Sequence, residues 1–272
     1  MTTAASKSVR LWQISDSHCY PDDSTPLEWS TETVYPNQSL RAVLNHLKVQ
    51  VADHDALFIT GDLAQEETAQ TYQRIKVLLD DFPLPIHVLP GNHDIPELMQ
   101  AHLGDKITLP SQVSFGQWHA ILLDTHAAGK PDGHLDDAQF NQLEQQLRAI
   151  PGGEFAIILM HHHPIDIGSE WMDRMGLQQK QRFWEIVSTF NCVKAVFNGH
   201  IHQAFHGEYR TASGCVIPVF GTPATCIQLK PTHPVFEFDH LRPAWREIVL
   251  HPDGTLETEV HYLELCKLSE HD

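Results

Sequence analysis

The sequence predicts an α/β protein whose main sheet is completed by a second sheet. Two observations predict it. Over the first two thirds of the chain, short apolar runs alternate with segments whose apolar residues recur at helical spacing. After Gln203, short apolar runs separated by turn residues follow one another, with no long helix between them. Alternating strands and helices followed by strands alone are typical of an α/β core that carries a further antiparallel sheet.

Each predicted strand of the α/β part is a short apolar run. Phe155–Met160 is apolar throughout, which is expected of a strand that is buried on both faces. Pro90-Gly91 follows another run and predicts a turn at its end. The predicted strands are Val9–Ile14, Ala56–Thr60, Leu84–Leu89, Trp118–Asp124, Phe155–Met160 and Val193–Phe197.

Helices are predicted where apolar residues recur three and four positions apart. One of them opens with Asp136 and has Gln139 three residues on, which matches a capping box, and Pro151-Gly152-Gly153 ends it. Residues 165–177 are expected to be irregular. The predicted helices are Leu40–Val51, a segment from about Glu66, Asp136–Ile150 and Phe183–Phe190.

The last third of the chain is predicted to be mainly strand. Asp253-Gly254 lies between two apolar runs and predicts a hairpin. The strand candidates are Val216–Phe220, Val235–Phe238, Trp245–Leu250 and Thr258–Leu263. Because no repeat or linker interrupts the chain, we expect a single domain over 1–272. Its motif-bearing core is expected at 9–203, and the strands of 204–265 are expected to complete the second sheet.

Composition excludes several classes of function. The chain has 18 Lys and Arg against 35 Asp and Glu, a net charge of −17. A surface this acidic disfavours non-specific binding to nucleic acid or to an anionic membrane, both of which need basic residues. No apolar run approaches the ~18 residues of a membrane span, and Met1–Arg10 has no apolar core of a secretory signal.

Cysteine usage indicates a reducing compartment. The five cysteines form no Cys-x-x-Cys pair, so neither a disulfide framework nor a structural zinc knuckle is expected. We therefore predict a cytoplasmic protein.

Polar side chains follow five of the apolar runs, at the point where each run ends. Ligands of α/β sheets bind outside the carboxyl ends of the strands. Asp16 and His18 are separated by one residue, as are His200 and His202. In an extended segment this spacing places both side chains of a pair on the same side. Seven such residues are too many for one tetrahedral zinc but suit two ions that share a carboxylate, and the mixed donors favour Mn, Fe or Zn. The candidate metal ligands are Asp16, His18, Asp62, Asn92, His161, His200 and His202.

This pattern resembles the calcineurin-like metallophosphoesterase superfamily, because five blocks of that family occur in its order over residues 9–203. The blocks are Asp16-x-His18, Gly61-Asp62, Gly91-Asn92-His93-Asp94, His161 in a His-His-His-Pro run, and Gly199-His200-x-His202. Longer segments resemble the bacterial class III 3′,5′-cyclic AMP phosphodiesterases of the CpdA type. These segments are Thr60–Gln65, Leu159–Pro164, Gly199–Gln203, Thr225–Pro231 and Pro243–Arg246. The resemblance implies the metallophosphoesterase fold, a four-layer α-β-β-α sandwich of two packed mixed sheets flanked by helices.

The resemblance also implies a role for each matching residue. The cofactors would be two divalent ions, Fe²⁺ or Mn²⁺ with Zn²⁺ as the alternative, and Asp62 would bridge them. The first ion would be held by Asp16, His18, Asp62 and His202, and the second by Asp62, Asn92, His161 and His200. Substrate would contact His18, Asp62, Asn92, His93, His161 and His202.

Two further residues are candidates for catalysis. His93 directly follows the candidate ligand Asn92, so it is expected to reach over the phosphate, stabilise transition-state charge and protonate the leaving group. Asp94 is expected to orient His93. The sequence leaves open the roles of His162, of His163 and of residues 165–177, which either pack or line a nucleotide pocket.

The function that this resemblance implies is hydrolysis of 3′,5′-cyclic AMP to 5′-AMP by a water or hydroxide that two metals activate, lowering the second messenger. One alternative is a broader phosphodiesterase, or another nucleotide or phosphoester hydrolase, with the same dinuclear site. A non-catalytic metal-binding scaffold is another. The motifs leave these open because they describe the metals and not the leaving group. The expected partner is the cyclic nucleotide, without nucleic acid or membrane, and the chain is expected to be a monomer or homodimer.

Overall fold

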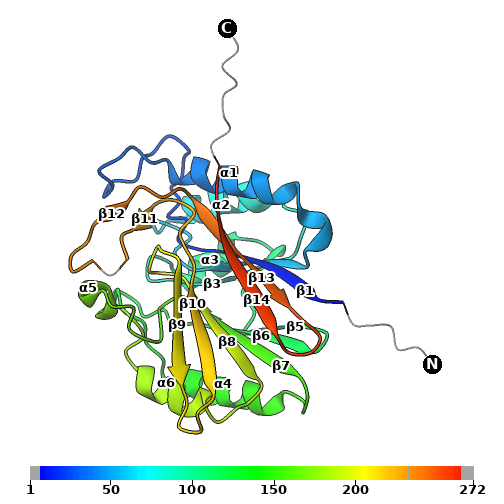
Figure 1. Cartoon of the computed structure of the whole chain (residues 1–272). Helices are drawn as coiled ribbons and strands as arrows, with labels where there is room; N and C mark the ends of the chain where they lie inside the picture. Colours follow the sequence, from blue (N-terminus) through cyan, green and yellow to red (C-terminus); the bar gives the residue numbers. More distant parts are fainter. Residues whose placement is uncertain (1–6, 232, 265–272) are drawn as a thin grey trace.

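Two six-stranded mixed sheets lie face to face between two layers of helices (Figure 1). The computed structural model describes residues 7–231 and 233–264, so most of the N-terminal segment and Cys266 lie outside the described residues. Within these ranges, no helix is both long enough and apolar enough to cross a membrane.

The first sheet has the order β14-β13-β1-β2-β3-β4. Its four strands β1 to β4 are parallel, whereas β13 is antiparallel to β1 and to β14. The strands are β1 (Val9–Ile14), β2 (Ala56–Thr60), β3 (Ile86–Leu89), β4 (Ile107–Thr108), β13 (Ala244–Leu250) and β14 (Leu256–Tyr262).

The second sheet has the order β5-β6-β7-β8-β10-β9, with antiparallel strands at both edges. Its strands are β5 (Gln112–Phe115), β6 (Trp118–Leu123), β7 (Phe155–Met160), β8 (Val193–Asn198), β10 (Val216–Gly221) and β9 (Phe205–Arg210). A short pair, β11 (Gln228–Leu229) and β12 (Phe238–Asp239), stands apart from both sheets.

Helices cover the outer face of each sheet. The first sheet is covered by α1 (Pro36–Lys48), α2 (Ala69–Leu79) and α3 (Pro96–His102), and a 3₁₀ turn (η1) follows α1 at Val51–Asp53. The second is covered by α4 (Asp137–Ala149) and α6 (Lys180–Val187), and α5 (Glu170–Asp173) is a single turn. The capping box of α4 is present: Gln139 N donates to Asp136 Oδ1 and Asp136 N donates to Gln139 Oε1, both at 2.8 Å.

Side-chain alternation along the strands explains the four layers. In β1, Leu11 lies in the apolar core between the two sheets, whereas its neighbour Trp12 packs under the helices. In β2, Phe58 likewise lies between the two sheets, and its neighbour Leu57 packs under the helices. A strand with apolar residues on both faces is stable only when both faces are covered. The predicted α/β sandwich of two packed mixed sheets flanked by helices is therefore confirmed.

The prediction for the last third of the chain needs correction. Strands β9 and β10 extend the second sheet, but β13 and β14 join the first sheet at the free edge of β1, where Val9 pairs with Leu250. Ile248 and Leu250 then point into the core between the sheets. The expected strand Val235–Phe238 is a loop up to β12, whereas α3, β5 and β9 were not predicted. The single domain over 1–272 stays a prediction.

Candidate active site

The candidate site lies between the two sheets, where five parallel strands end. The loops after β1, β2 and β3 carry Asp16, Asp62 and Asn92 from the first sheet, and the ends of β7 and β8 carry His161 and His200 from the second. Backbone hydrogen bonds hold the first two loops side by side, since Asp16 N donates to Gly61 O at 3.0 Å and His18 N donates to Asp62 O at 2.9 Å. The structure brings all seven candidate ligands to one place.

The backbone of this place is unusual. Among the described residues, the non-glycine positions in the left-handed region are Asp16, His18, Asp62, His200 and His202, with φ between 47° and 68°. The expectation that the paired ligands lie on extended segments is therefore wrong. Each such residue costs about 1–3 kcal/mol of conformational strain. The strain is tolerated because these tight turns direct the side chains inward from the strand ends.

One group of side chains is formed by Asp16, His18 and His202, whose ligand atoms lie within 4.8 Å of one another. His202 Nδ1 donates to the carbonyl of Ile227 at 2.8 Å, so its Nε2 directs a lone pair into the group. That Nε2 lies 3.4 Å from Asp16 Oδ1 and 3.2 Å from His18 Nε2. Burial lowers the pKa of His18 to about 3, which keeps this ring neutral and able to bind a cation.

A second group forms around His161. Its Nδ1 donates to the Thr60 carbonyl at 2.7 Å, so its Nε2 faces Asn92 Oδ1 at 3.1 Å and Asp62 Oδ2 at 3.4 Å. Three acceptors that converge in this way need a proton or a metal ion between them. Burial lowers the pKa of His161, but the Asp62 carboxylate outweighs burial and raises it to about 9. This place therefore attracts positive charge.

Asp62 lies between the two groups. Its Oδ2 is 3.4 Å from His161 Nε2 on one side and 3.7 Å from His18 Nε2 on the other. Its Oδ1 accepts from the backbone N of His93 at 2.8 Å. Asp62 is only 2 % exposed and Asp16 is fully buried; within the described part of the chain, only histidines form ion pairs with them.

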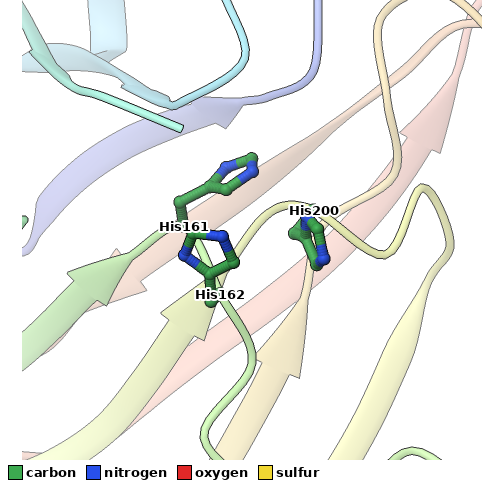
Figure 2. A group of neighbouring side chains, drawn as sticks. All are labelled: His161, His162 and His200. Atoms are coloured by element: carbon green, nitrogen blue, oxygen red, sulfur yellow. The ribbon is translucent and has the colours of Figure 1, made fainter. Parts of the chain in front are cut away.

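Figure 2 shows His161, His162 and His200 facing one another. Their ring nitrogens lie within 4.8 Å of one another. The Nε2 atoms of His162 and His200 are buried and have no hydrogen-bond partner among the described residues, which costs about 1–3 kcal/mol for each atom that binds nothing. His162 Nδ1 is within 2.8 Å of Thr125 Oγ1. These orphaned nitrogens and the buried carboxylates fit divalent metal ions, and they bring His162, whose role the sequence left open, to the centre.

The two candidate catalytic residues are placed differently from each other. His93 is half-buried, and its ring packs 5.1 Å from the ring of His18, in a group with Asp62. Asp94 faces away from the centre, because its carboxylate accepts from three backbone amides and from the Tyr72 hydroxyl. The donors are Leu63 N (3.1 Å), Ala64 N (3.2 Å), Gly91 N (3.0 Å) and Tyr72 Oη (3.1 Å).

The expected role of Asp94 therefore needs correction. No hydrogen bond between Asp94 and the His93 side chain occurs among the described residues. The carboxylate instead ties the loop after β2 to the loop after β3. Burial, followed by the nearby Asp62, raises the pKa of Asp94 to about 6. Its adjacency to His93 in the sequence does not fix its direction in space.

Two glycines are required by the close packing of these loops. A Cβ at Gly61, whose φ is +92°, would lie 2.4 Å from His161 Nδ1. A Cβ at Gly91 would lie 2.2 Å from Asp62 Oδ1. Any side chain at either position would push a candidate ligand out of place.

A pocket of about 230 Å³ opens beside this centre. Its lining includes candidate ligands and His93 together with the aromatic residues Trp29, Trp171 and Phe236. Sequence reasoning considered Trp171 but missed Trp29 and Phe236, which no motif identifies. A larger cleft of about 430 Å³ between α3 and α4 contains none of the candidate site residues.

Comparison with known proteins agrees with this arrangement. The family model of calcineurin-like phosphoesterases matches residues 9–204. A protein of Vibrio vulnificus named 3′,5′-cyclic adenosine monophosphate phosphodiesterase CpdA is 37% identical over 263 residues, 96% of this chain and 92% of that protein. The Escherichia coli K12 protein of the same name is 34% identical over 257 residues, covering 94% and 90%.

A crystal structure of a dimetal phosphatase from Danio rerio aligns with 94% of this chain and 99% of its own, with a TM-score of 0.64 at 12% identity. At that identity the likeness shows the fold alone. The family match covers residues 9–204, and the relatives and the fold extend the agreement over nearly the whole chain. The chain therefore belongs to the calcineurin-like phosphoesterase family.

Proposed function

We propose that this protein is a metal-dependent phosphodiesterase that hydrolyses 3′,5′-cyclic AMP to 5′-AMP. The observation that carries the proposal is the position of Asp62 Oδ2 between His161 Nε2 and His18 Nε2, which belong to two separate groups of potential ligands. The names of the Vibrio and Escherichia relatives supply the substrate.

The residues divide into two sets in this proposal. Asp16, His18, Asp62 and His202 would hold one ion, and Asp62, Asn92, His161 and His200 would hold the other. When bound, two divalent ions supply an activated water as nucleophile and neutralise charge on the phosphate oxygens. Fe²⁺ or Mn²⁺, with Zn²⁺ as the alternative, stay the predicted ions, since imidazole and carboxylate donors suit all three.

His93 is the proposed general acid. Its backbone N is held by Asp62 Oδ1, and its ring lies at the pocket beside His18 and Asn92. From there it reaches the phosphate, donates a hydrogen bond to a charged oxygen and protonates the departing 3′ oxygen. His18, Asp62, Asn92, His161 and His202 are the other residues proposed to contact substrate.

The expected partners, location and oligomeric state belong to the same proposal. A net charge of −17 still disfavours nucleic acid and anionic membranes as partners, which leaves the small cyclic nucleotide. A cytoplasmic location and a monomer or homodimer stay predictions.

Comparison of kcat/KM for cyclic AMP, cyclic GMP and bis(p-nitrophenyl) phosphate tests the substrate. We expect cyclic AMP to be preferred, activity to disappear on exhaustive chelation, and Mn²⁺ or Fe²⁺ to restore it. A preference for the artificial diester would favour the broader phosphodiesterase. Full activity after chelation would contradict the metal-dependent reaction, and metal binding without any turnover would favour the scaffold.

A further inference from the structure

The pocket beside the metal centre has two chemically different sides. The metal side consists of His18, Asp62, Asn92, His93, His200 and His202. The aromatic side, called the aromatic wall below, consists of Trp29, Trp171 and Phe236, and Met172, Met175 and Leu229 also line the pocket. Trp29 and Phe236 lie in loops and Trp171 lies in the single turn α5, all outside the two large sheets, and no Lys or Arg lines the described pocket.

Trp29 is held in a fixed orientation. Its Nε1 donates to Gln65 Oε1 at 3.0 Å, and its ring lies edge-on to His18 at 5.7 Å and stacks on Phe238 at 5.9 Å. Gln65 ends the Thr60–Gln65 segment that begins at the strand carrying Asp62. Gln65 therefore couples the orientation of the aromatic wall to the loop that forms the metal centre.

Trp171 offers an unused hydrogen-bond donor. Its Nε1 is buried and has no partner in the described structure, and its ring packs edge-on against Phe236 at 5.4 Å. A buried N–H without a partner costs about 1–3 kcal/mol unless a ligand accepts from it. Phe236 itself is 45% exposed, so its ring is open to a ligand in the pocket.

The size of the pocket limits what it can hold. Its volume of about 230 Å³ is below the ~300–1,000 Å³ of pockets that enclose a whole drug-sized ligand. It therefore suits one part of a nucleotide beside the aromatic wall, with the phosphate at the metal side. A flat, uncharged, aromatic group is the part that an aromatic wall binds best, since stacking on a side chain contributes about 1–3 kcal/mol for each base.

We propose that the aromatic wall binds the nucleobase of the substrate, with the Trp171 N–H donating to a ring nitrogen of the base. This inference rests on the proposed function, since it assigns the base-binding part of the same site. Adenine fits this donor because its unsubstituted ring nitrogens all accept hydrogen bonds. The free ring nitrogen of uracil carries a proton and cannot accept.

Binding of reaction products separates the base from the phosphate without requiring turnover. Isothermal titration calorimetry of the full-length, Mn²⁺-loaded protein would compare 5′-AMP, 5′-UMP and ribose 5-phosphate. We expect 5′-AMP to bind about tenfold more tightly than ribose 5-phosphate, and 5′-UMP to lie between them. Equal affinities for 5′-AMP and ribose 5-phosphate would overturn the inference.

Two variants assign the effect to residues. Trp171→Phe keeps an aromatic ring but removes the donor. It should therefore weaken the binding of 5′-AMP about fivefold and leave the affinities for 5′-UMP and ribose 5-phosphate unchanged. Phe236→Ala should weaken the binding of both nucleotides about threefold to tenfold. Val235→Ala, at a neighbouring residue that is 60% exposed and outside the pocket lining, is the matched control and should change nothing.

The outcomes distinguish this inference from the proposed function. Variants that weaken the binding of ribose 5-phosphate as much as the binding of 5′-AMP would overturn the inference that the wall binds the base. A wild-type protein that binds 5′-AMP in this selective way but does not hydrolyse cyclic AMP would support the wall and contradict the proposed reaction.

Discussion

The candidate metal centre and the aromatic wall line one pocket but are built in different ways. The metal centre consists of side chains that leave the ends of five buried parallel strands, and its backbone turns are strained. The wall consists of Trp29 and Phe236, which lie on loops, and Trp171, which lies in the single turn α5; neither large sheet contains these segments. The centre is fixed by the packing of the two sheets, whereas the wall is fixed by a few contacts between loops. Changes in the centre should therefore affect every substrate, and changes in the wall should affect mainly the base.

The largest effect is expected for Asp62→Ala. Asp62 lies between both groups of potential ligands, so its loss should reduce turnover by about 10³-fold and remove both ions. Elemental analysis of the purified protein and the rate with each diester would measure these effects. Asp105→Ala is the matched control, because it removes an exposed carboxylate that is not among the candidate site residues.

Asn92→Ala sharpens the same test. Among the described residues the Asn92 side chain hydrogen-bonds only to His161, so its loss should weaken the binding of mainly one ion. Near-normal turnover and full metal content in Asp62→Ala would contradict the central position of this carboxylate.

His93→Ala is expected to reduce kcat by about 10²-fold, the usual contribution of general acid catalysis. The metal content should stay at the wild-type value, since His93 is proposed to act on the leaving oxygen. The rate should fall least for bis(p-nitrophenyl) phosphate, whose leaving group needs no proton. Loss of metal from this variant would show that His93 is a ligand instead.

Asp94→Ala should mainly change stability. It leaves the amides of Leu63, Ala64 and Gly91 without their acceptor, which is expected to cost about 3–5 kcal/mol of the free energy of unfolding. Urea denaturation with and without metal would measure this cost. A double-mutant cycle with His93→Ala tests the corrected role, because two independent residues have additive effects on kcat. Strong coupling in that cycle would restore Asp94 as the partner of His93.

The smallest effect is expected for Gln65→Ala. This change removes the acceptor of the Trp29 indole but no side chain from the pocket. KM for cyclic AMP should rise about threefold while kcat stays the same, as for the loss of one half-buried hydrogen bond. Glu66→Ala, at the exposed neighbouring residue, is the control. A fall in kcat with unchanged KM would mean that the wall and the metal centre are not separate parts of the site.

The sequence predicted the metal centre far better than the wall. Asp16, Asp62 and His200 each follow directly on a buried apolar run, so their place in the fold could be inferred from the position of that run. Trp29 and Phe236 are about 200 residues apart in the chain and follow no strand motif. Their meeting at 5.9 Å depends on how two loops fold over the site, which local sequence patterns do not encode.

The sequence also did not predict the directions in which several side chains point. Asp94 is adjacent to His93 but turns toward three backbone amides, because a buried carboxylate needs donors on both oxygens. His18 and His202 were expected on extended segments and adopt left-handed turns instead. In both cases a pattern predicted that the residue lies near the site but not the way in which its side chain points.

By itself, the sequence determined the alternation of strands and helices, the capping box of α4, the residues that gather at the strand ends and the family. These features depend on local periodicity and on residue type, which a single chain segment carries. The tertiary structure decided that β13 and β14 join the first sheet, that His162 lies beside His200, and that aromatic residues line the pocket of the candidate metal centre. Each of these depends on contacts between segments far apart in the chain, and only the packing of the two sheets brings those segments together.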